Sequence, residues 1–285
     1  MIKYNLKSDK AERKRIIMIT GKRIVLTGCN SGIGLEFLKL LVRGGNEILA
    51  VDKQTDRLEA FDPAVVHILK ADVSSKEAVD LIFETAETLF PFIDIFYANA
   101  GYPYFEEMNY ADWDRVAAIF ETNVFSPIYS YQKYVRYLRG RSGVFAVTVS
   151  AIGEMAMPGY TLYSASKFAM HGFQQGIRFE KPKNVQLTCL YPVATDTNFF
   201  RTANPIMFRK PFPVQRPQIV AKKMMAGIEN GKNRVSPCTL FGFAKILMGV
   251  CPPVRTVYMA LEKQKFNELK RDIENGAGRP WPEEA

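Results

Sequence analysis

The sequence is poor in the residues that build metal sites and disulfide frameworks. It has only two histidines, His67 and His171, among 285 residues. The four cysteines lie far apart and form no CxxC pair; they are Cys29, Cys189, Cys238 and Cys251. This excludes a histidine-rich metal site, and the cysteine spacing fits neither a zinc site nor a disulfide framework. No metal is predicted, and the cysteines suit a reducing compartment, which predicts a cytoplasmic protein.

Long hydrophobic runs are also missing. Residues 1–17 are basic and polar and contain no apolar core of the kind that a signal peptide needs. The short apolar stretch after Cys238 is broken by Lys245 and ended by Pro252-Pro253, whereas a membrane-spanning helix needs about 20 apolar residues. Apolar residues make up 47% of the chain and charged residues 24%, which is typical of a soluble globular protein and excludes a disordered or collagen-like one.

Charge is distributed unevenly along the chain. The formal net charge is +9, and residues 201–270 hold 13 lysines and arginines against 3 acidic residues. Such an excess favours an anionic partner for this segment, such as an acidic substrate, a lipid headgroup or nucleic acid. Lys222-Lys223 and Arg234 lie beside no recognised nucleic-acid-binding motif, so nucleic acid is not predicted as a partner.

Short apolar, β-branched runs alternate with longer helix-compatible segments from Lys22 to about residue 200. The predicted strands are Arg23–Thr27, Glu47–Val51, Val65–Leu69, Ile93–Tyr97, Val144–Ser150 and Val185–Tyr191. The predicted helices include Ile33–Arg43, Lys76–Phe90, Ala111–Leu138 and Thr161–Glu180. Alternation at this spacing predicts βαβ units, and therefore an α/β fold with a doubly wound parallel sheet and helices on both faces.

No proline- or glycine-rich linker divides the chain before about residue 200. This predicts a single α/β domain over residues 22–237, which includes a substrate lid, and an apolar-basic helical extension over residues 238–285. Residues 1–21 form a basic leader. Because Met18 stands just before the first predicted strand, two interpretations of the leader stay open: a frayed basic arm, or residues that precede the true start.

A glycine-rich turn follows the first predicted strand and precedes a helix; it reads Thr27-Gly28-Cys29-Asn30-Ser31-Gly32-Ile33-Gly34. Glycines at such a junction let the backbone turn tightly and let a pyrophosphate approach the N–H groups at the helix start. Asp52 ends the second predicted strand, where a carboxylate can accept hydrogen bonds from the ribose of an adenine dinucleotide. Each feature alone is compatible with an ordinary turn, but together they favour a dinucleotide site.

Tyr163 and Lys167 are four residues apart on a predicted helix and therefore share one face. A free phenol has a pKa of about 10, too high for efficient acid–base catalysis near neutral pH, and a nearby ammonium lowers that pKa. The pair is a candidate acid–base site, although such pairs also occur on helices by chance.

Several motifs occur together in a fixed order. They are TGCNSGIG (Thr27–Gly34), Asp72-Val73, Asn99-Ala100-Gly101, Thr122-Asn123-Val124, Ser150, YSASK (Tyr163–Lys167) and Pro192 through Thr197. In this combination the chain resembles the short-chain dehydrogenase/reductase family over roughly residues 22–200. The resemblance implies a Rossmann fold and an NAD(P)-dependent oxidoreductase that interconverts a secondary alcohol and a ketone. The alternative is a non-catalytic nucleotide-binding regulatory or scaffold protein on the same fold.

The resemblance also implies catalytic roles. Tyr163 matches the family's proton donor and acceptor, and Lys167 matches the residue that lowers the tyrosine pKa and holds the nicotinamide ribose. Ser150 would bind the substrate oxygen. Asn123 matches the asparagine that positions a water next to the lysine. Since all four residues are present, the resemblance points to a competent enzyme.

A larger set of positions is implied to bind the cofactor. They are Thr27, Gly28, Ser31, Gly32, Ile33, Gly34, Asp52, Asp72, Val73, Asn99, Gly101, Tyr163, Lys167, Pro192 and Thr197. Asp52 would repel a 2′-phosphate, and Ser31 stands where a basic residue often marks NADP use, so NAD is favoured over NADP. Lys53 favours NADP instead, because a cation beside Asp52 could reach a 2′-phosphate.

The chain departs from the family pattern at two places. Val193 follows Pro192 where the family usually has glycine, which puts the geometry of the nicotinamide loop in doubt. The candidate seventh strand, Arg234-Val235-Ser236, is followed by an apolar-basic segment, which argues against the tetramer of the acyl-carrier-protein reductases. The helices Ala111–Leu138 and Thr161–Glu180 resemble those that form family dimers, so a homodimer is predicted.

The segment at about residues 197–216 is rich in aromatic and apolar residues. It predicts a lid that closes over an apolar, lipid-like small molecule, the alternative being that these residues pack beneath a loop. Two interpretations of residues 238–257 also stay open: a helix that lies on a membrane surface beside anionic headgroups, or a helix that packs over the substrate cleft or a partner subunit. The apolar residues concerned are Leu240, Phe241, Phe243, Leu247 and Met248.

Overall fold

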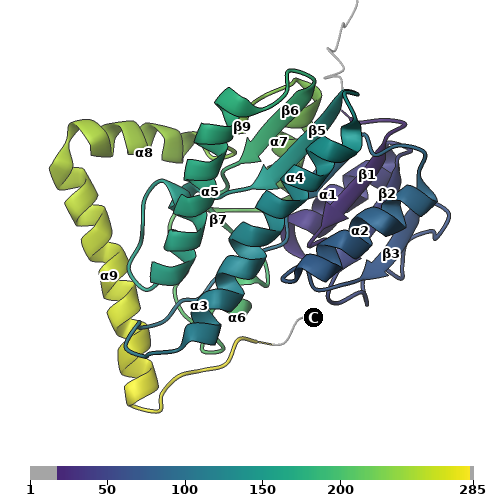
Figure 1. The fold of residues 1–285 in the computed structure, drawn as a ribbon. Coiled ribbons are helices and arrows are strands. Elements are labelled where there is room, and N and C mark those ends of the chain that lie inside the picture. Colours follow the sequence, from purple (N-terminus) through teal and green to yellow (C-terminus); the bar gives the residue numbers. More distant parts are fainter. Residues whose placement is uncertain (1–17, 283–285) are drawn as a thin grey trace, which may run out of the picture.

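The computed structural model describes residues 18–282, so most of the predicted leader lies outside the described residues. Seven parallel strands form one sheet in the order β3-β2-β1-β4-β5-β6-β9 (Figure 1). Their bounds are β1 (Arg23–Thr27), β2 (Glu47–Asp52), β3 (Val66–Lys70), β4 (Ile95–Ala98), β5 (Gly143–Thr148), β6 (Val185–Leu190) and β9 (Arg234–Val235). The strand order reverses between β1 and β4, as in doubly wound Rossmann folds, and this confirms the predicted fold class.

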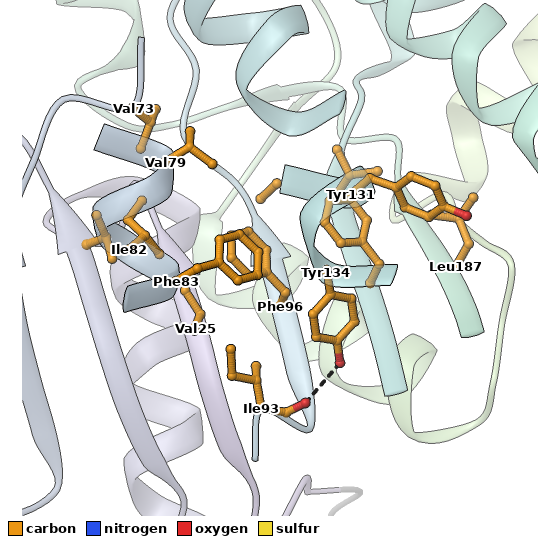
Figure 2. Close-up of a cluster of buried hydrophobic side chains, with 14 of the residues drawn as sticks. Val25, Val73, Val79, Ile82, Phe83, Ile93, Phe96, Tyr131, Tyr134 and Leu187 are labelled. Carbon is orange, nitrogen blue, oxygen red and sulfur yellow. Dashed lines mark hydrogen bonds between the residues drawn. The ribbon is translucent and has the colours of Figure 1, made fainter. Parts of the chain in front are cut away.

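Helices cover both faces of the sheet, because successive residues of a strand point to opposite sides. The first face carries α2 (Lys76–Leu89), α4 (Ser126–Leu138) and α5 (Thr161–Glu180), and the second carries α1 (Gly32–Arg43) and α7 (Pro217–Glu229). Val25 of β1 is buried on the first face, and its neighbours Ile24 and Leu26 are buried on the second. On the first face, Phe83 of α2 stacks on Phe96 of β4 with ring centroids 5.2 Å apart (Figure 2).

The helix predicted over Ala111–Leu138 begins at Trp113 and contains a π-helical turn. The helix α3 (Trp113–Phe120) and α4 are joined by a π-helical turn over Glu121–Phe125. The predicted segment is helical from Trp113 to Leu138, but hydrophobic periodicity did not reveal the π-turn, because it does not distinguish this wider turn from an α-helical one. The turn buries Asn123, one of the residues implied to be catalytic.

The chain after β6 builds the elements at one end of the molecule. They are β7 (Ala194–Thr195), α6 (Phe199–Ala203), β8 (Val214–Gln215), α8 (Thr239–Val250) and α9 (Pro252–Glu274). Figure 1 shows α8 extending away from the sheet and α9 returning along the flank of the molecule. Within the described residues, no single helix is long and apolar enough to cross a membrane, and α8 and α9 pass that test only as a pair bent by 120°.

Candidate active site

A cavity of about 680 Å³ lies at the carboxyl ends of the parallel strands. Its lining includes Gly28 after β1, Asp52 at the end of β2 and Thr148 at the end of β5. Beyond these it reaches Phe241 of α8 and Tyr258 of α9. Ligand sites of open α/β sheets lie at this edge, so the cavity is the candidate active site.

The glycine turn after β1 is shaped by close backbone approaches. A Cβ atom at Gly28, whose φ is +69°, would lie 2.6 Å from Ala100 Cα. A Cβ atom at Gly34 would lie 2.0 Å from the Gly28 carbonyl oxygen. These distances leave no room for a side chain, so the turn presents bare backbone at the start of α1, where an anionic pyrophosphate is stabilised by the helix N-terminus.

Hydrogen bonds join this turn to the neighbouring strands. The Thr27 hydroxyl accepts from the backbone N–H groups of Asn99 and Ala100, over 3.1 and 3.2 Å. The Asn99 side chain donates to the Gly28 carbonyl over 2.8 Å and accepts from Thr148 over 2.9 Å. Thr27 and Gly34 do not line the cavity; they belong to the framework beneath it.

Asp52 and Asp72 both line the cavity. Asp52 accepts the backbone N–H groups of Asn30 and Gln54, over 2.9 and 3.1 Å, which holds its carboxylate beside the glycine turn. Asp72 accepts the Ser74 N–H over 3.0 Å, and the N-cap of α2 is Ser75. These residues lead into α2, and the Asp72 carboxylate still contributes to the cavity wall.

Tyr163 lies in the first turn of α5, buried at 7% exposure, and lines the cavity beside Ser150. Burial raises the pKa of Tyr163 above its usual value of about 10, while a hydrogen bond with Ser150 lowers it. The phenol is therefore protonated at neutral pH and can donate a proton. Ser150 has a φ of +125°, a strained value for a non-glycine residue and one that concentrates at functional sites.

Lys167 follows one turn later on α5. Its Nζ lies 5.7 Å from the centroid of the Tyr163 ring and donates to the Thr148 carbonyl over 3.1 Å. Burial lowers the pKa of Lys167 to about 8. The expected lowering of the Tyr163 pKa by Lys167 is not found in this structure, because burial of the phenol dominates its pKa and Ser150 supplies the opposing contact.

Asn123 does not line the cavity but lies behind it. Its side chain accepts from the Tyr102 N–H over 3.0 Å, donates to the Tyr102 carbonyl over 2.9 Å, and donates to Ser166 over 3.0 Å. A Cβ atom at Gly101 would come within 2.9 Å of Asn123 Oδ1 and 3.4 Å of Lys167 Nζ. The π-helical turn thus places Asn123 close to the lysine, in support of the site.

The remaining implied cofactor residues lie on the cavity wall. They are Ser31, Gly32, Ile33, Val73, Asn99, Gly101, Pro192 and Thr197. Val193, the departure from the family pattern, lines the cavity as well, and the Pro192 carbonyl before it accepts from Ser150 over 3.4 Å. Within residues 18–282, no three His, Cys, Asp or Glu side chains are grouped so that they could hold a metal ion.

The predicted lid segment is divided between packed residues and residues that line the cavity. Phe208 packs in a buried cluster and does not line the cavity. Phe199, Phe200 and Phe212 do line it, and the Phe199 ring meets the Tyr163 ring edge-on with centroids 5.4 Å apart. The segment is therefore partly packed and partly a wall beside Tyr163, and its closure over a substrate stays a prediction.

Sequence reasoning missed several cavity residues. They are Met155, Met157, Tyr160 and Tyr258, of which Tyr258 comes from α9. The apolar segment after Cys238 was recognised, but no local pattern shows that Phe241 of α8 faces the cavity, because that depends on how α8 packs. The residues present fit a dinucleotide cofactor: bare glycine backbone at one end, an acid at the end of β2, and Tyr163 and Lys167 at the other end.

Residues 22–206 match the family described as short chain dehydrogenase. The chain belongs to the short-chain dehydrogenase family. It is 30% identical over 190 residues to an uncharacterized oxidoreductase of Staphylococcus saprophyticus, covering 63% of this chain and 76% of that protein. It is 29% identical over 238 residues to the 3-ketodihydrosphingosine reductase of Bos taurus, covering 75% of this chain and 70% of that enzyme.

Solved structures show the same fold. A short chain dehydrogenase from Burkholderia cenocepacia in complex with NADP has a TM-score of 0.71 at 21% identity, covering 85% of this chain and 98% of that chain. A short chain dehydrogenase/reductase from Burkholderia phymatum in complex with NAD has a TM-score of 0.70 at 17% identity, covering 93% and 98%. Together with the family match and the relatives named oxidoreductase and reductase, this confirms the predicted NAD(P)-dependent short-chain dehydrogenase/reductase and argues against the non-catalytic alternative.

Proposed function

We propose that this short-chain dehydrogenase interconverts a secondary alcohol and a ketone on an apolar, lipid-like small molecule. The observation that carries the proposal is a set of apolar and aromatic side chains in the cavity wall. Its members are Met155, Met157, Tyr160, Phe199, Phe200, Phe212, Phe241 and Tyr258. Such a wall favours apolar ligands, since each Å² of apolar surface removed from water contributes about 25 cal/mol. One relative is named a 3-ketodihydrosphingosine reductase, which supports a lipid-like ketone.

In the proposed reaction, Ser150 and Tyr163 hold the substrate oxygen by hydrogen bonds. Tyr163 donates its phenolic proton to that oxygen during reduction and accepts the alcohol proton during oxidation. A bound nicotinamide cofactor supplies or takes up the hydride. The Lys167 ammonium stabilises the phenolate that Tyr163 becomes when its proton leaves, because an opposite charge nearby favours the charged form. Asn123 bonds to the Tyr102 backbone and to the Ser166 hydroxyl, and Ser166 precedes Lys167 on α5. These bonds help to hold the part of α5 that carries Lys167.

The substrate class is tested by steady-state reduction of methyl ketones of increasing chain length, from butanone to 2-decanone. We expect kcat/KM to rise by up to about fourfold per added methylene, the factor for burying about 0.8 kcal/mol of apolar surface. A flat or falling series contradicts the apolar substrate. A protein that oxidises neither NADH nor NADPH with any ketone contradicts the proposed reaction itself.

We also propose that NAD is preferred over NADP, because the Asp52 carboxylate is held at the end of β2 by two backbone N–H groups. Asp52→Asn keeps the side-chain shape and removes the charge that opposes a 2′-phosphate. The ratio of the dissociation constants for NADPH and NADH is expected to fall by about tenfold in this variant, as measured by fluorescence titration. Asp62→Asn, a turn acid outside the cavity, is the control. A wild-type enzyme that binds NADPH tenfold more tightly than NADH overturns the preference.

The predicted homodimer is proposed to form through the face that carries α3 and α5. Large apolar side chains are exposed there: Trp113 is 83% exposed, Phe168 43% and Phe179 93%. Phe168 and Phe179 are three helical turns apart and so lie on one face of α5, which a second copy of the chain would cover. Phe179→Asp is expected to convert a dimer to a monomer in analytical ultracentrifugation, while Leu81→Asp on α2 leaves it unchanged. A monomeric wild type refutes the proposal.

We further propose a cytoplasmic location with peripheral membrane contact through α8. None of its residues is buried, and Phe243, Ile246 and Val250 are 74%, 68% and 80% exposed. The basic excess of residues 201–270 would draw this apolar helix to anionic headgroups. Cosedimentation with phosphatidylglycerol vesicles is expected at low salt, weaker at high salt, and lost in the double variant Phe243→Ser/Ile246→Ser. Wild-type protein that stays in the supernatant at low salt refutes membrane contact.

A further inference from the structure

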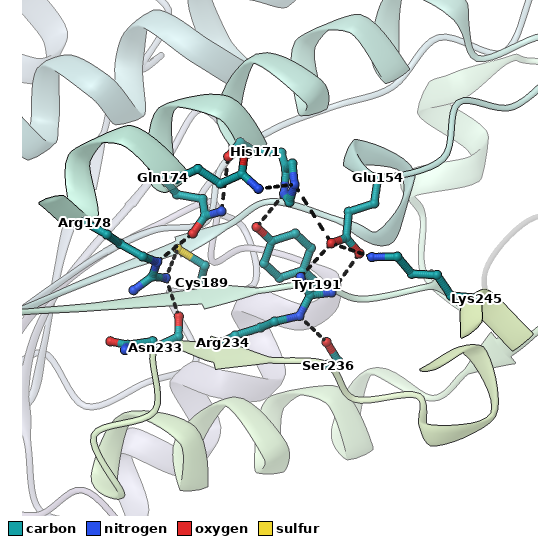
Figure 3. Close-up of polar contacts among 11 residues, drawn as sticks. Glu154, His171, Gln174, Arg178, Cys189, Tyr191, Asn233, Arg234, Ser236 and Lys245 are labelled. Atoms are coloured by element: carbon teal, nitrogen blue, oxygen red, sulfur yellow. Dashed lines mark hydrogen bonds and ion pairs between the residues drawn. The ribbon is translucent and has the colours of Figure 1, made fainter. Parts of the chain in front are cut away.

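Glu154 belongs to a cluster of polar side chains outside the proposed reaction site (Figure 3). Its side chain is 6% exposed and accepts two hydrogen bonds from Arg234, both at 2.7 Å. Lys245 Nζ lies 2.9 Å from the same carboxylate, and His171 Nε2 lies at 4.0 Å. Burial raises the pKa of Glu154, but the bonds from Arg234 and Lys245 lower it to about 2, so the carboxylate stays charged near neutral pH.

This cluster joins segments that are distant in the sequence. Glu154 lies on the loop that follows Ser150 and leads to α5. Arg234 belongs to β9, and its guanidinium lies 3.9 Å from the ring centroid of Tyr191, which follows β6. Lys245 comes from α8. The ion pair between Glu154 and Lys245 therefore links the loop after Ser150 to the C-terminal extension.

The helix α8 makes few polar contacts with the rest of the molecule. None of its residues is buried, and the backbone N–H of Phe241 is capped locally by Cys238. Among the described residues, the Lys245–Glu154 ion pair is its one polar side-chain contact with another element. Its neighbour α9 is held along its length: Tyr258 donates to the Phe212 carbonyl over 2.9 Å, Glu262 is 5% exposed and Leu269 is 2% exposed. Phe241, Ala244 and Met248 are half-buried on one side of α8, and the Lys245–Glu154 ion pair adds a polar contact to this limited apolar packing.

The same helix contributes to the cavity. Phe241 lines it, and Phe241 and Lys245 are four residues apart on α8, so they share a face. Met155, the residue after Glu154 in the loop before α5, lines the same cavity. We infer that Glu154 and Lys245 are positioning residues that hold α8 as a wall of the substrate cavity and so determine affinity for the chain of an apolar substrate. The substrate part of this inference rests on the proposed function.

Hydrogen–deuterium exchange of the resting enzyme tests the ion pair without any substrate. Lys245→Met and Glu154→Gln each remove one charge, and both are expected to speed exchange of the amides of residues 239–250 by about three- to fivefold. Lys245→Arg keeps the charge and is expected to restore slow exchange. Lys263→Met on α9 is the matched control, because within the described chain this exposed lysine makes no ion pair. Unchanged exchange in both charge-removing variants overturns the inference.

Kinetics test what the ion pair does for the substrate. In both variants, KM for 2-decanone is expected to rise about three- to fivefold, while KM for butanone and kcat change by less than about twofold. An effect in Lys245→Met but not in Glu154→Gln shows that Lys245 acts without its partner, and it overturns the inference. Faster exchange with an unchanged KM for 2-decanone overturns the substrate role. If no ketone is reduced by the wild type, the proposed function fails, and the exchange data alone decide whether the ion pair holds α8.

Discussion

Tyr163→Phe is expected to lower kcat by about 10²–10⁴-fold, because it removes the proton that the substrate oxygen must receive. The substitution keeps the ring, whose centroid lies 5.4 Å from that of Phe199 and 6.3 Å from that of Tyr160, so the local packing survives. The dissociation constant for the cofactor is expected to stay within about twofold of wild type. Steady-state kinetics and a fluorescence titration measure the two quantities.

A matched control comes from another buried tyrosine. Tyr131 is 4% exposed, lies outside the cavity, and its hydroxyl has no hydrogen-bond partner among the described residues. Tyr131→Phe deletes the same atom and is expected to leave kcat near wild type. If Tyr163→Phe retains more than about a tenth of the wild-type rate, a different group acts as the acid.

Lys167→Met is expected to reduce both kcat, by about 10²-fold or more, and the affinity for the cofactor. The variant keeps most of the side-chain volume but loses the ammonium that stabilises the Tyr163 phenolate and the donor that would hold the nicotinamide ribose. Both losses are measured by single-turnover reduction and cofactor titration. If the variant binds the cofactor as tightly as the wild type does, Lys167 does not hold the nicotinamide ribose. Its role is then limited to stabilising the Tyr163 phenolate.

The same substitution is expected to stabilise the fold at neutral pH. Burial lowers the pKa of Lys167 from 10.5 to about 8, so between these values the unfolded chain binds more protons and wild-type stability rises with pH. At pH 7 the buried charge opposes folding, and its removal outweighs the lost bond to Thr148, for a net gain of about 2 kcal/mol in the free energy of unfolding. Urea unfolding at pH 7 and at pH 10 tests this, because the gain is expected to shrink at the higher pH. A destabilised variant at pH 7 contradicts it.

Local sequence determined much of the fold and of the site. The strand Arg23–Thr27 and the helix Thr161–Glu180 have the bounds that the sequence predicts, because a buried parallel strand is a continuous apolar run and a long helix has a 3.6-residue period. The glycine turn and the Tyr163–Lys167 pair are also local, since each motif is a short run whose spacing sets its geometry. The structure brings both motifs to one cavity, as their order along a βαβ chain implies.

Tertiary structure decided the rest, because it depends on contacts between residues that no local pattern connects. The π-helical turn at Asn123 and the direction of the Tyr163 pKa shift both depend on what surrounds these side chains in the folded state. The ion pair between Lys245 of α8 and Glu154 likewise forms only in the folded chain. The sequence by itself determined an NAD(P)-binding α/β enzyme with a tyrosine–lysine site. Packing of the C-terminal helices decided which apolar side chains form the far wall of the cavity, because an apolar helix face has no partner until the chain path supplies one.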